Sequence, residues 1–127
     1  MIAVDTSALM AILLSEAEAD ACTAILEGEA HVLISAGTVA EAMIVARRRN
    51  VGEEMGALIE DLAFEVVSVT PAAAHRIAAV YERWGKGVHP AGLNFGDCFS
   101  YEVAKEHACR LLYVGGDFAK TDIESAL

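Results

Sequence analysis

Short apolar runs alternate with longer amphipathic segments along this chain of 127 residues. Short runs of apolar and β-branched residues predict strands, and apolar residues that recur every three or four positions predict helices. The predicted strands are Ile2–Val4, His31–Ser35, Glu65–Val69 and Arg110–Val114, and a further short strand is expected near Ile123. The predicted helices are a segment capped by Thr6 and Ser7 that runs to Leu14, residues 16–28, Thr38–Asn50, residues 53–63, a helix that begins at Pro71, and Asp97–His107.

Two of these helices carry recognisable start signals. Thr38 and Glu41 have the spacing of a capping box, in which the side chains of both residues satisfy free backbone N–H groups. Thr70 offers an N-cap hydroxyl directly before Pro71, which suits the first helical position. The one long irregular stretch, Gly85–Phe95, ends where the helix of Asp97 begins.

Strands that alternate with helices indicate βαβ units, and such units build a parallel sheet with helices on both faces. We therefore expect a three-layer α/β/α fold with a central parallel sheet of four to five strands, formed as one domain by residues 1–127. In such sheets the functional groups gather in the crevice at the carboxyl ends of the strands.

Four acidic residues fall at that edge of the predicted sheet. Asp5 directly follows the first strand, Glu41 lies in the first turn of the helix after the second, Asp97 begins a helix, and Asp117 follows the fourth strand. Neighbouring parallel strands lie about 4.8 Å apart, so these acids can converge around one cation.

Three of the four acids also have a purely structural interpretation. Glu41 can complete the capping box, Asp97 can cap its own helix, and Asp117 can stabilise a turn. Asp5 is harder to explain in this way, because an unpaired acid beside an apolar strand is costly and the first 46 residues contain no Lys or Arg.

The overall charge limits how the protein can meet a polyanion. The chain has 9 basic and 19 acidic residues, a net charge of −10, and so no general attraction for nucleic acid. Contact with a polyanion then needs a local cationic patch or a bound cation. One or two Mg²⁺ ions, or Mn²⁺, would relieve the repulsion among the four acids and could activate water against a phosphate.

Other features exclude further classes of protein. The three cysteines have no C-x-x-C spacing, which argues against a disulfide framework and a thiolate zinc site. The apolar run Ala8–Leu14 is far shorter than a membrane span, and no basic region of a signal peptide precedes it, so we expect a cytoplasmic protein. This run is either wholly buried or partly covered by another chain.

Two basic residues are candidates for binding a polyanion. Arg48, in the only basic cluster, lies seven residues after Glu41 and so on the same helix face, where it could reach a phosphate or simply end a solvated helix. Lys86 lies in the irregular stretch, either as a guide for the polyanion or as an exposed loop residue.

Several segments together resemble the PIN-domain family, and specifically the VapC toxins of bacterial toxin–antitoxin pairs. The resemblance covers nearly the whole chain and rests on Asp5–Leu9, Ala36–Met43, Gly85–Tyr101, Tyr113–Phe118 and Thr121–Ile123, of which Gly85–Tyr101 is the most specific. It implies a metal-dependent endoribonuclease with a five-stranded parallel sheet, held inactive by a VapB-type antitoxin and usually a homodimer.

By position, the resemblance makes Asp5 and Asp97 the direct metal ligands, with Glu41 and Asp117 as further acids of the site. Ser7 would orient the site through its hydroxyl. Many relatives have two adjacent acids where this chain has Gly116 and Asp117, so Asp122 remains an alternative for the fourth acid.

Two other functions remain open from the sequence. One is a phosphohydrolase with Asp5 as its nucleophile, although Ser7 stands where a second acid would be expected and Lys120 is the only lysine downstream of Asp117. The other is a non-catalytic module that binds a metal and a partner.

Overall fold

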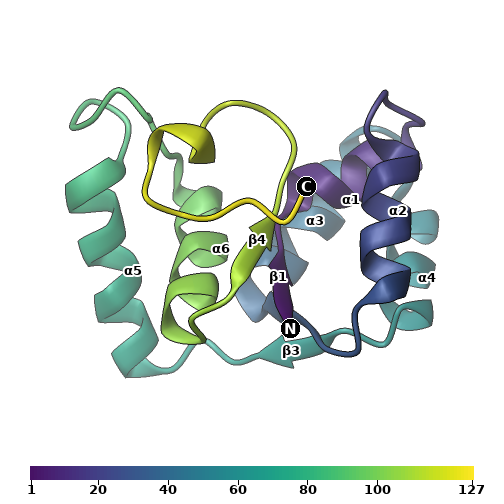
Figure 1. The fold of residues 1–127 in the computed structure, drawn as a ribbon, viewed down its shortest axis with the longest axis horizontal. Coiled ribbons are helices and arrows are strands. Elements are labelled where there is room, and N and C mark those ends of the chain that lie inside the picture. Colours follow the sequence, from purple (N-terminus) through teal and green to yellow (C-terminus); the bar gives the residue numbers. More distant parts are fainter.

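The computed structural model describes all residues from 1 to 127, and its elements alternate as expected (Figure 1). The strands are β1 (Ile2–Val4), β2 (Val32–Ser35), β3 (Glu65–Val67) and β4 (Arg110–Leu112). The helices are α1 (Thr6–Leu13), α2 (Ala19–Gly28), α3 (Ala36–Arg48), α4 (Gly52–Asp61), α5 (Pro71–Trp84) and α6 (Phe95–Glu106), and a 3₁₀ turn, η1, covers Phe118–Lys120.

The four strands form one parallel sheet in the order β3-β2-β1-β4. Ile2 in β1 pairs with Val32 on one side and with Arg110 on the other, and β1 and β4 run side by side toward the top in Figure 1, where both end. This confirms the predicted α/β/α fold. The strand expected near Ile123 is reduced to a single bridge between Leu111 and Ser125.

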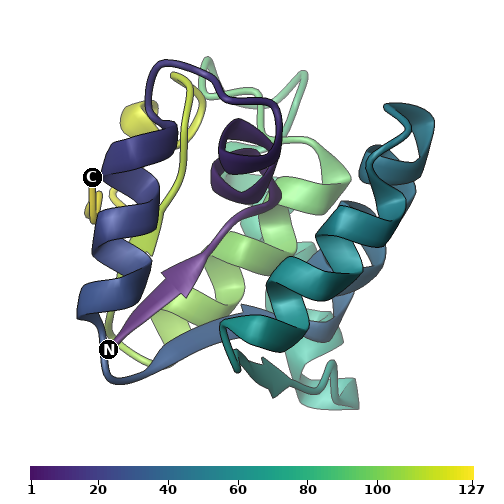
Figure 2. The ribbon, with the colours of Figure 1, turned by 90° about the vertical axis from the view of Figure 1, so that its right-hand side faces the viewer.

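Successive residues of the strands point to opposite faces of the sheet and pack into two separate hydrophobic cores. Ile2, Val4 and Ile34 face a core closed by α1 to α4, and Figure 2 looks onto this side, with α2 and α4 near the viewer and α6 behind the sheet. Ala3 and Leu33 face the second core, which α5, α6 and the C-terminal segment close. Helices on both faces exclude solvent from β1 and β2, as is usual for parallel strands.

The apolar run Ala8–Leu14 is mostly an internal element. Ala8 to Ala11 are buried and Ile12 to Leu14 are half-buried, packed against the core that α2, α3 and α4 share. All three cysteines are free. None of the helices combines the length and the apolar character needed to cross a membrane.

Helix starts differ from the predictions where another polar residue takes the capping role. Asp5, not Thr6 or Ser7, is the N-cap of α1. The N-cap of α3 is Ser35, whose hydroxyl accepts from the backbone N–H of Gly37 at 3.2 Å, so the predicted capping box of Thr38 and Glu41 is wrong. The start of α5 is confirmed: the hydroxyl of Thr70 accepts from the backbone N–H of Ala73 at 3.1 Å.

Candidate functional site

Asp5 lies at the centre of a hydrogen-bonded cluster at the carboxyl edge of the sheet. Its side chain is only 3% exposed. Oδ2 accepts from the backbone N–H and the hydroxyl of Ser7, at 3.0 and 2.6 Å, and Oδ1 accepts from the hydroxyl of Ser100 at 2.5 Å. The hydroxyl of Ser7 also accepts from the backbone N–H of Val114 at 3.0 Å, which ties the first turn of α1 to the segment that follows β4. Asp5 is therefore fixed from both of its oxygens.

Ser100 and Thr38 are site residues that the sequence did not reveal. Both are fully buried, on α6 and α3, and their hydroxyl oxygens lie 3.2 Å apart. Since the single proton of Ser100 goes to Asp5, Thr38 is the donor in this pair. A chain of hydroxyls thus runs from α3 through α6 to Asp5. The only sequence signal was a polar residue on the buried face of each helix.

Glu41 reaches the same edge from the second turn of α3. The hydroxyl of Thr6 donates to its Oε1 at 2.6 Å. A Cβ placed on Gly96 would lie 1.5 Å from Glu41 Oε2, so the carboxylate occupies space that only a glycine leaves free. Burial and the charge of Asp5 raise the pKa of Glu41, and the hydrogen bond from Thr6 partly offsets that rise.

Asp97 stands in the first turn of α6 and completes a capping box with Asn94. The backbone N–H of Asp97 donates to Asn94 Oδ1 at 2.8 Å, and that of Asn94 donates to Asp97 Oδ2 at 2.9 Å. The capping role and the proximity to the site therefore coexist. Burial first, and then the charges of Asp5, Asp117 and Glu41, raise the pKa of Asp97 to about 7 against the hydrogen bond from Asn94.

Asp117 is exposed, directly before η1, and its charge acts on Asp97. The charges of Asp5, Glu41 and Asp117 thus all act on Asp97 at this edge of the sheet. None of the ion pairs in the chain includes any of the four, so their negative charge is uncompensated by the protein.

Asp122 lies apart from these acids in a cluster of its own. Its Oδ1 accepts from the hydroxyl of Tyr101, which in turn accepts from Trp84 Nε1 at 3.1 Å. Its Oδ2 lies 3.0 Å from Lys105 Nζ. Burial tends to raise the pKa of Asp122, but the Tyr101 and Lys105 hydrogen bonds and the charges of Lys105 and Arg83 hold it below its usual value. These contacts tie the C-terminal segment to α5 and α6.

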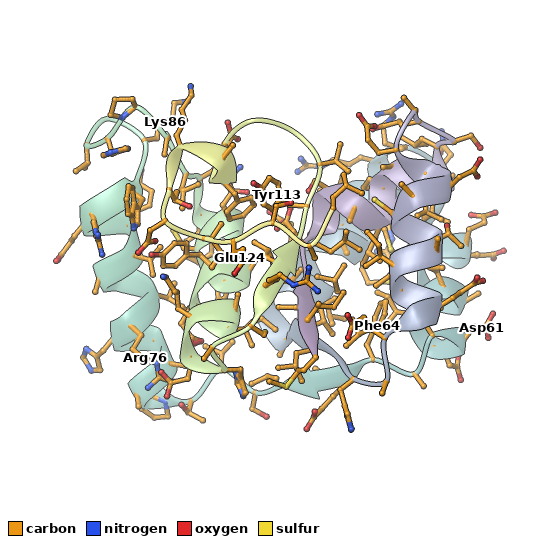
Figure 3. The ribbon with its side chains drawn as sticks, viewed as in Figure 1. Asp61, Phe64, Arg76, Lys86, Tyr113 and Glu124 are labelled. Atoms are coloured by element: carbon orange, nitrogen blue, oxygen red, sulfur yellow. The ribbon has the colours of Figure 1, made fainter.

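The two candidate cations differ in position. Arg48, at the end of α3, lines a groove that also contains Glu41 and Gly96. Lys86 is exposed in the loop between α5 and α6, and Figure 3 shows it pointing outward. The structure therefore associates Arg48, and not Lys86, with the surroundings of the acids.

The donors fit a hard divalent cation in their chemistry. They are all carboxylate and hydroxyl oxygens, and none of the four carboxylates forms an ion pair with a lysine or arginine. No three acidic, histidine or cysteine side chains come close enough together to form a metal cluster by themselves. A cation here would therefore be held directly by one or two carboxylates with water in the remaining positions, as Mg²⁺ commonly is.

Comparison with known proteins decides the family. The PIN domain model matches residues 2–124. Ribonuclease VapC30 of Mycobacterium tuberculosis is 39% identical over 123 residues, which cover 94% of each chain, and Ribonuclease VapC36 of the same species is 41% identical over 126 residues, 95% of this chain and 90% of the relative. The chain belongs to the PIN-domain family, among its VapC members.

Solved structures of two such proteins share the fold of this PIN domain. The crystal structure of VapC20 of Mycobacterium tuberculosis, titled a Sarcin-Ricin loop cleaving toxin, superposes with a TM-score of 0.77 at 19% identity, over 97% of this chain and 96% of that one. A toxin–antitoxin complex from Klebsiella pneumoniae gives 0.71 at 20% identity, over 96% and 93%.

The raised pKa of Asp97 predicts a pH-dependent cost to the stability of this PIN domain without divalent ions. Between the ordinary value of 3.8 and about 7, the folded chain keeps a proton that the unfolded chain has lost, so stability falls as pH rises through this window. Asp97→Asn removes that cost and keeps an acceptor for Asn94. We expect it to be more stable than the wild type at pH 8 in EDTA, by on the order of 2 kcal/mol after screening, and about equal at pH 4.

Urea unfolding at several pH values measures this difference. The exposed Asp61→Asn serves as the control and should keep the pH dependence of the wild type. An Asp97→Asn protein that loses stability with pH as steeply as the wild type would show that Asp97 is not the strained group.

The close approach of Gly96 to Glu41 predicts a local effect of a single methyl group. In Gly96→Ala the new Cβ must displace the end of the Glu41 side chain and break its bond with Thr6, while the rest of the fold remains. We expect the pKa of Glu41, measured by NMR titration in EDTA, to fall back toward 4.5 as the carboxylate becomes hydrated. Gly28→Ala, where a Cβ meets nothing within 4 Å, should leave it unchanged. An unaltered Glu41 titration in Gly96→Ala would contradict the described packing.

Proposed function

We propose that this protein is a metal-dependent endoribonuclease toxin that hydrolyses RNA phosphodiester bonds and is neutralised by a cognate VapB-type antitoxin. One observation carries the proposal: Asp97 lies within reach of the charges of three other carboxylates, none with a cationic partner, in a chain about 40% identical to VapC ribonucleases. The antitoxin partner is supported by the likeness to a toxin of a toxin–antitoxin complex. We place its action in the cytoplasm, and the homodimer stays a prediction.

Asp5 and Asp97 would hold one or two Mg²⁺ or Mn²⁺ ions, with Glu41 and Asp117 beside them. Such an ion supplies a bound water of lowered pKa and neutralises charge on the phosphate under attack. The protein contributes the placement of the acids. Ser7 and Ser100 fix both oxygens of Asp5, Thr6 holds Glu41, and Asn94 holds Asp97. His89 and His107 bond to backbone groups near them in the chain, and the proposed hydrolysis needs no histidine base.

The position of Asp5 argues against the alternative in which it is a nucleophile for phosphate monoesters. Three donors, two on Ser7 and one on Ser100, occupy its oxygens, and its side chain is almost fully buried. Lys120 forms no ion pair or hydrogen bond with it. The alternative therefore lacks the lysine that it would need beside Asp5.

Removing one charge from the proposed ligand set should abolish cleavage. We expect Asp97→Asn to cleave RNA at least about a hundredfold more slowly than the wild type, because loss of a direct ligand costs more than loss of a residue that only hydrogen-bonds to a ligand. The variant should also no longer inhibit growth when it is expressed without the antitoxin. The measurement is cleavage by the purified chain, free of antitoxin, in Mg²⁺ or Mn²⁺, together with sequencing of RNA ends after induction.

Asp61→Asn provides the matched control with the same loss of an acid at an exposed site, and it should cleave normally. Full cleavage by Asp97→Asn at saturating Mg²⁺ would refute the role of Asp97. A wild-type chain that binds a metal and a partner but leaves RNA intact would instead establish the non-catalytic module.

A further inference from the structure

A groove of about 390 Å³ runs between α3 and α6 and is lined in part by Glu41. We call it the α3–α6 groove. Its lining comprises Gly37, Ala40, Glu41, Ile44, Val45, Arg48, Phe95, Gly96 and Phe99. Glu41 thus belongs both to the acid cluster and to the groove, so whatever occupies the groove lies next to the proposed site of cleavage.

One wall of the α3–α6 groove is the exposed ring of Phe95, which packs against Phe99. Phe95 is 71% exposed, the most exposed of the large apolar side chains. Its ring stands edge-on to the ring of Phe99, with centroids 4.9 Å apart and planes at 89°. Phe99 packs where a Cβ on Gly37 would come within 2.3 Å of its ring, so α3 supports it from below. Phe95 therefore offers an exposed aromatic surface that is supported on one side by Phe99.

The charges along the α3–α6 groove are arranged asymmetrically. Glu41 lies at one end and Arg48 at the other, seven residues and roughly 10 Å apart along the axis of α3. Arg48 makes no ion pair within the chain, in contrast to Arg76, Arg83 and Arg110. The groove therefore combines an apolar face, a free guanidinium and the edge of the acid cluster.

We propose that the α3–α6 groove holds an unpaired nucleobase of the RNA substrate, stacked on Phe95, while Arg48 contacts the phosphate on the far side of that base. The proposal rests on the proposed function and adds the residues that select and hold the substrate. A nucleotide matches all three features of the groove, because it has an aromatic face and an anionic group on either side. Stacking also contributes affinity that does not depend on the charge of a protein with net charge −10.

The experiment uses the full chain and a pool of random single-stranded RNA of about 12 nucleotides, with kcat and KM measured for cleavage in Mg²⁺ or Mn²⁺. We expect Phe95→Ala and Phe95→Leu to raise KM about tenfold, within a range of about 5- to 150-fold, with little change in kcat. Phe95→Trp should stay within threefold of the wild type. Phe95→Leu should also relax the base preference next to the cut, read from sequenced ends.

Matched variants distinguish an effect of the groove from the general effect of losing an aromatic ring or a positive charge. Tyr81→Leu removes an exposed aromatic ring from α5, outside the groove, and should leave KM unchanged. Arg48→Gln should raise KM and reduce the dependence of log KM on log salt by about one unit, whereas the neighbouring Arg49→Gln should do neither.

The possible failures are distinguishable. A wild-type chain that cuts no RNA contradicts the proposed function itself. A wild type that cuts the pool and a Phe95→Leu variant with unchanged KM and base preference overturn only the role of the groove. The groove proposal is also overturned if Phe95→Leu leaves KM unchanged but converts a dimer into a monomer in sedimentation velocity, since a second copy then covers Phe95.

Discussion

The repulsion among carboxylates that share one edge of the sheet is the constraint around which this molecule is built. Asp5, Glu41, Asp97 and Asp117 come from four separate segments, and the chain supplies no cation to offset them. A fold under no other demand would separate these charges or pair them. Here the raised pKa of Asp97 and Glu41 marks an arrangement that an added positive charge would relieve.

The fold holds these acids in place with short contacts between segments far apart in the chain. Ser100 on α6 and Ser7 on α1 both donate to Asp5, and the backbone N–H of Val114 secures Ser7. Glycines at positions 37 and 96 allow α3 and α6 to approach closely. The close packing of α3 and α6 that brings Glu41 to this edge also forms the α3–α6 groove. The placement of the acids and the proposed nucleobase-binding site therefore have the same structural cause.

Much of this architecture could be predicted from local patterns. Strands that alternate with helices imply a parallel sheet, and the position of Asp5 directly after β1 places it at the edge where such sheets bind ligands. Asp97 follows from the same rule together with the helix start after the irregular stretch. Patterns of this kind predict the structure correctly because they depend only on residues within a few positions of one another.

The features that local patterns missed depend on competition between possible N-cap residues, or on contacts between residues far apart in the sequence. Thr38 and Glu41 matched a capping box, yet Ser35 caps α3 because the helix begins earlier, which leaves Thr38 to bond with Ser100. No pattern in sequence shows that residues 62 positions apart will meet. Nothing in the sequence indicated that Asp122, the alternative fourth acid, would bond with Tyr101 and Lys105.

Thermal unfolding during a titration with Mn²⁺ or Mg²⁺ at pH 7.5 tests most directly whether this acidic edge binds a divalent cation. If it does, the melting temperature of the wild type rises steadily with metal concentration, by an amount equivalent to about 2.7 kcal/mol at a hundred times the dissociation constant. The rise should be largely lost in Asp5→Asn, while Asp122→Asn should keep it. A wild type indifferent to either ion, or an Asp5→Asn protein stabilised as much as the wild type, would contradict the account.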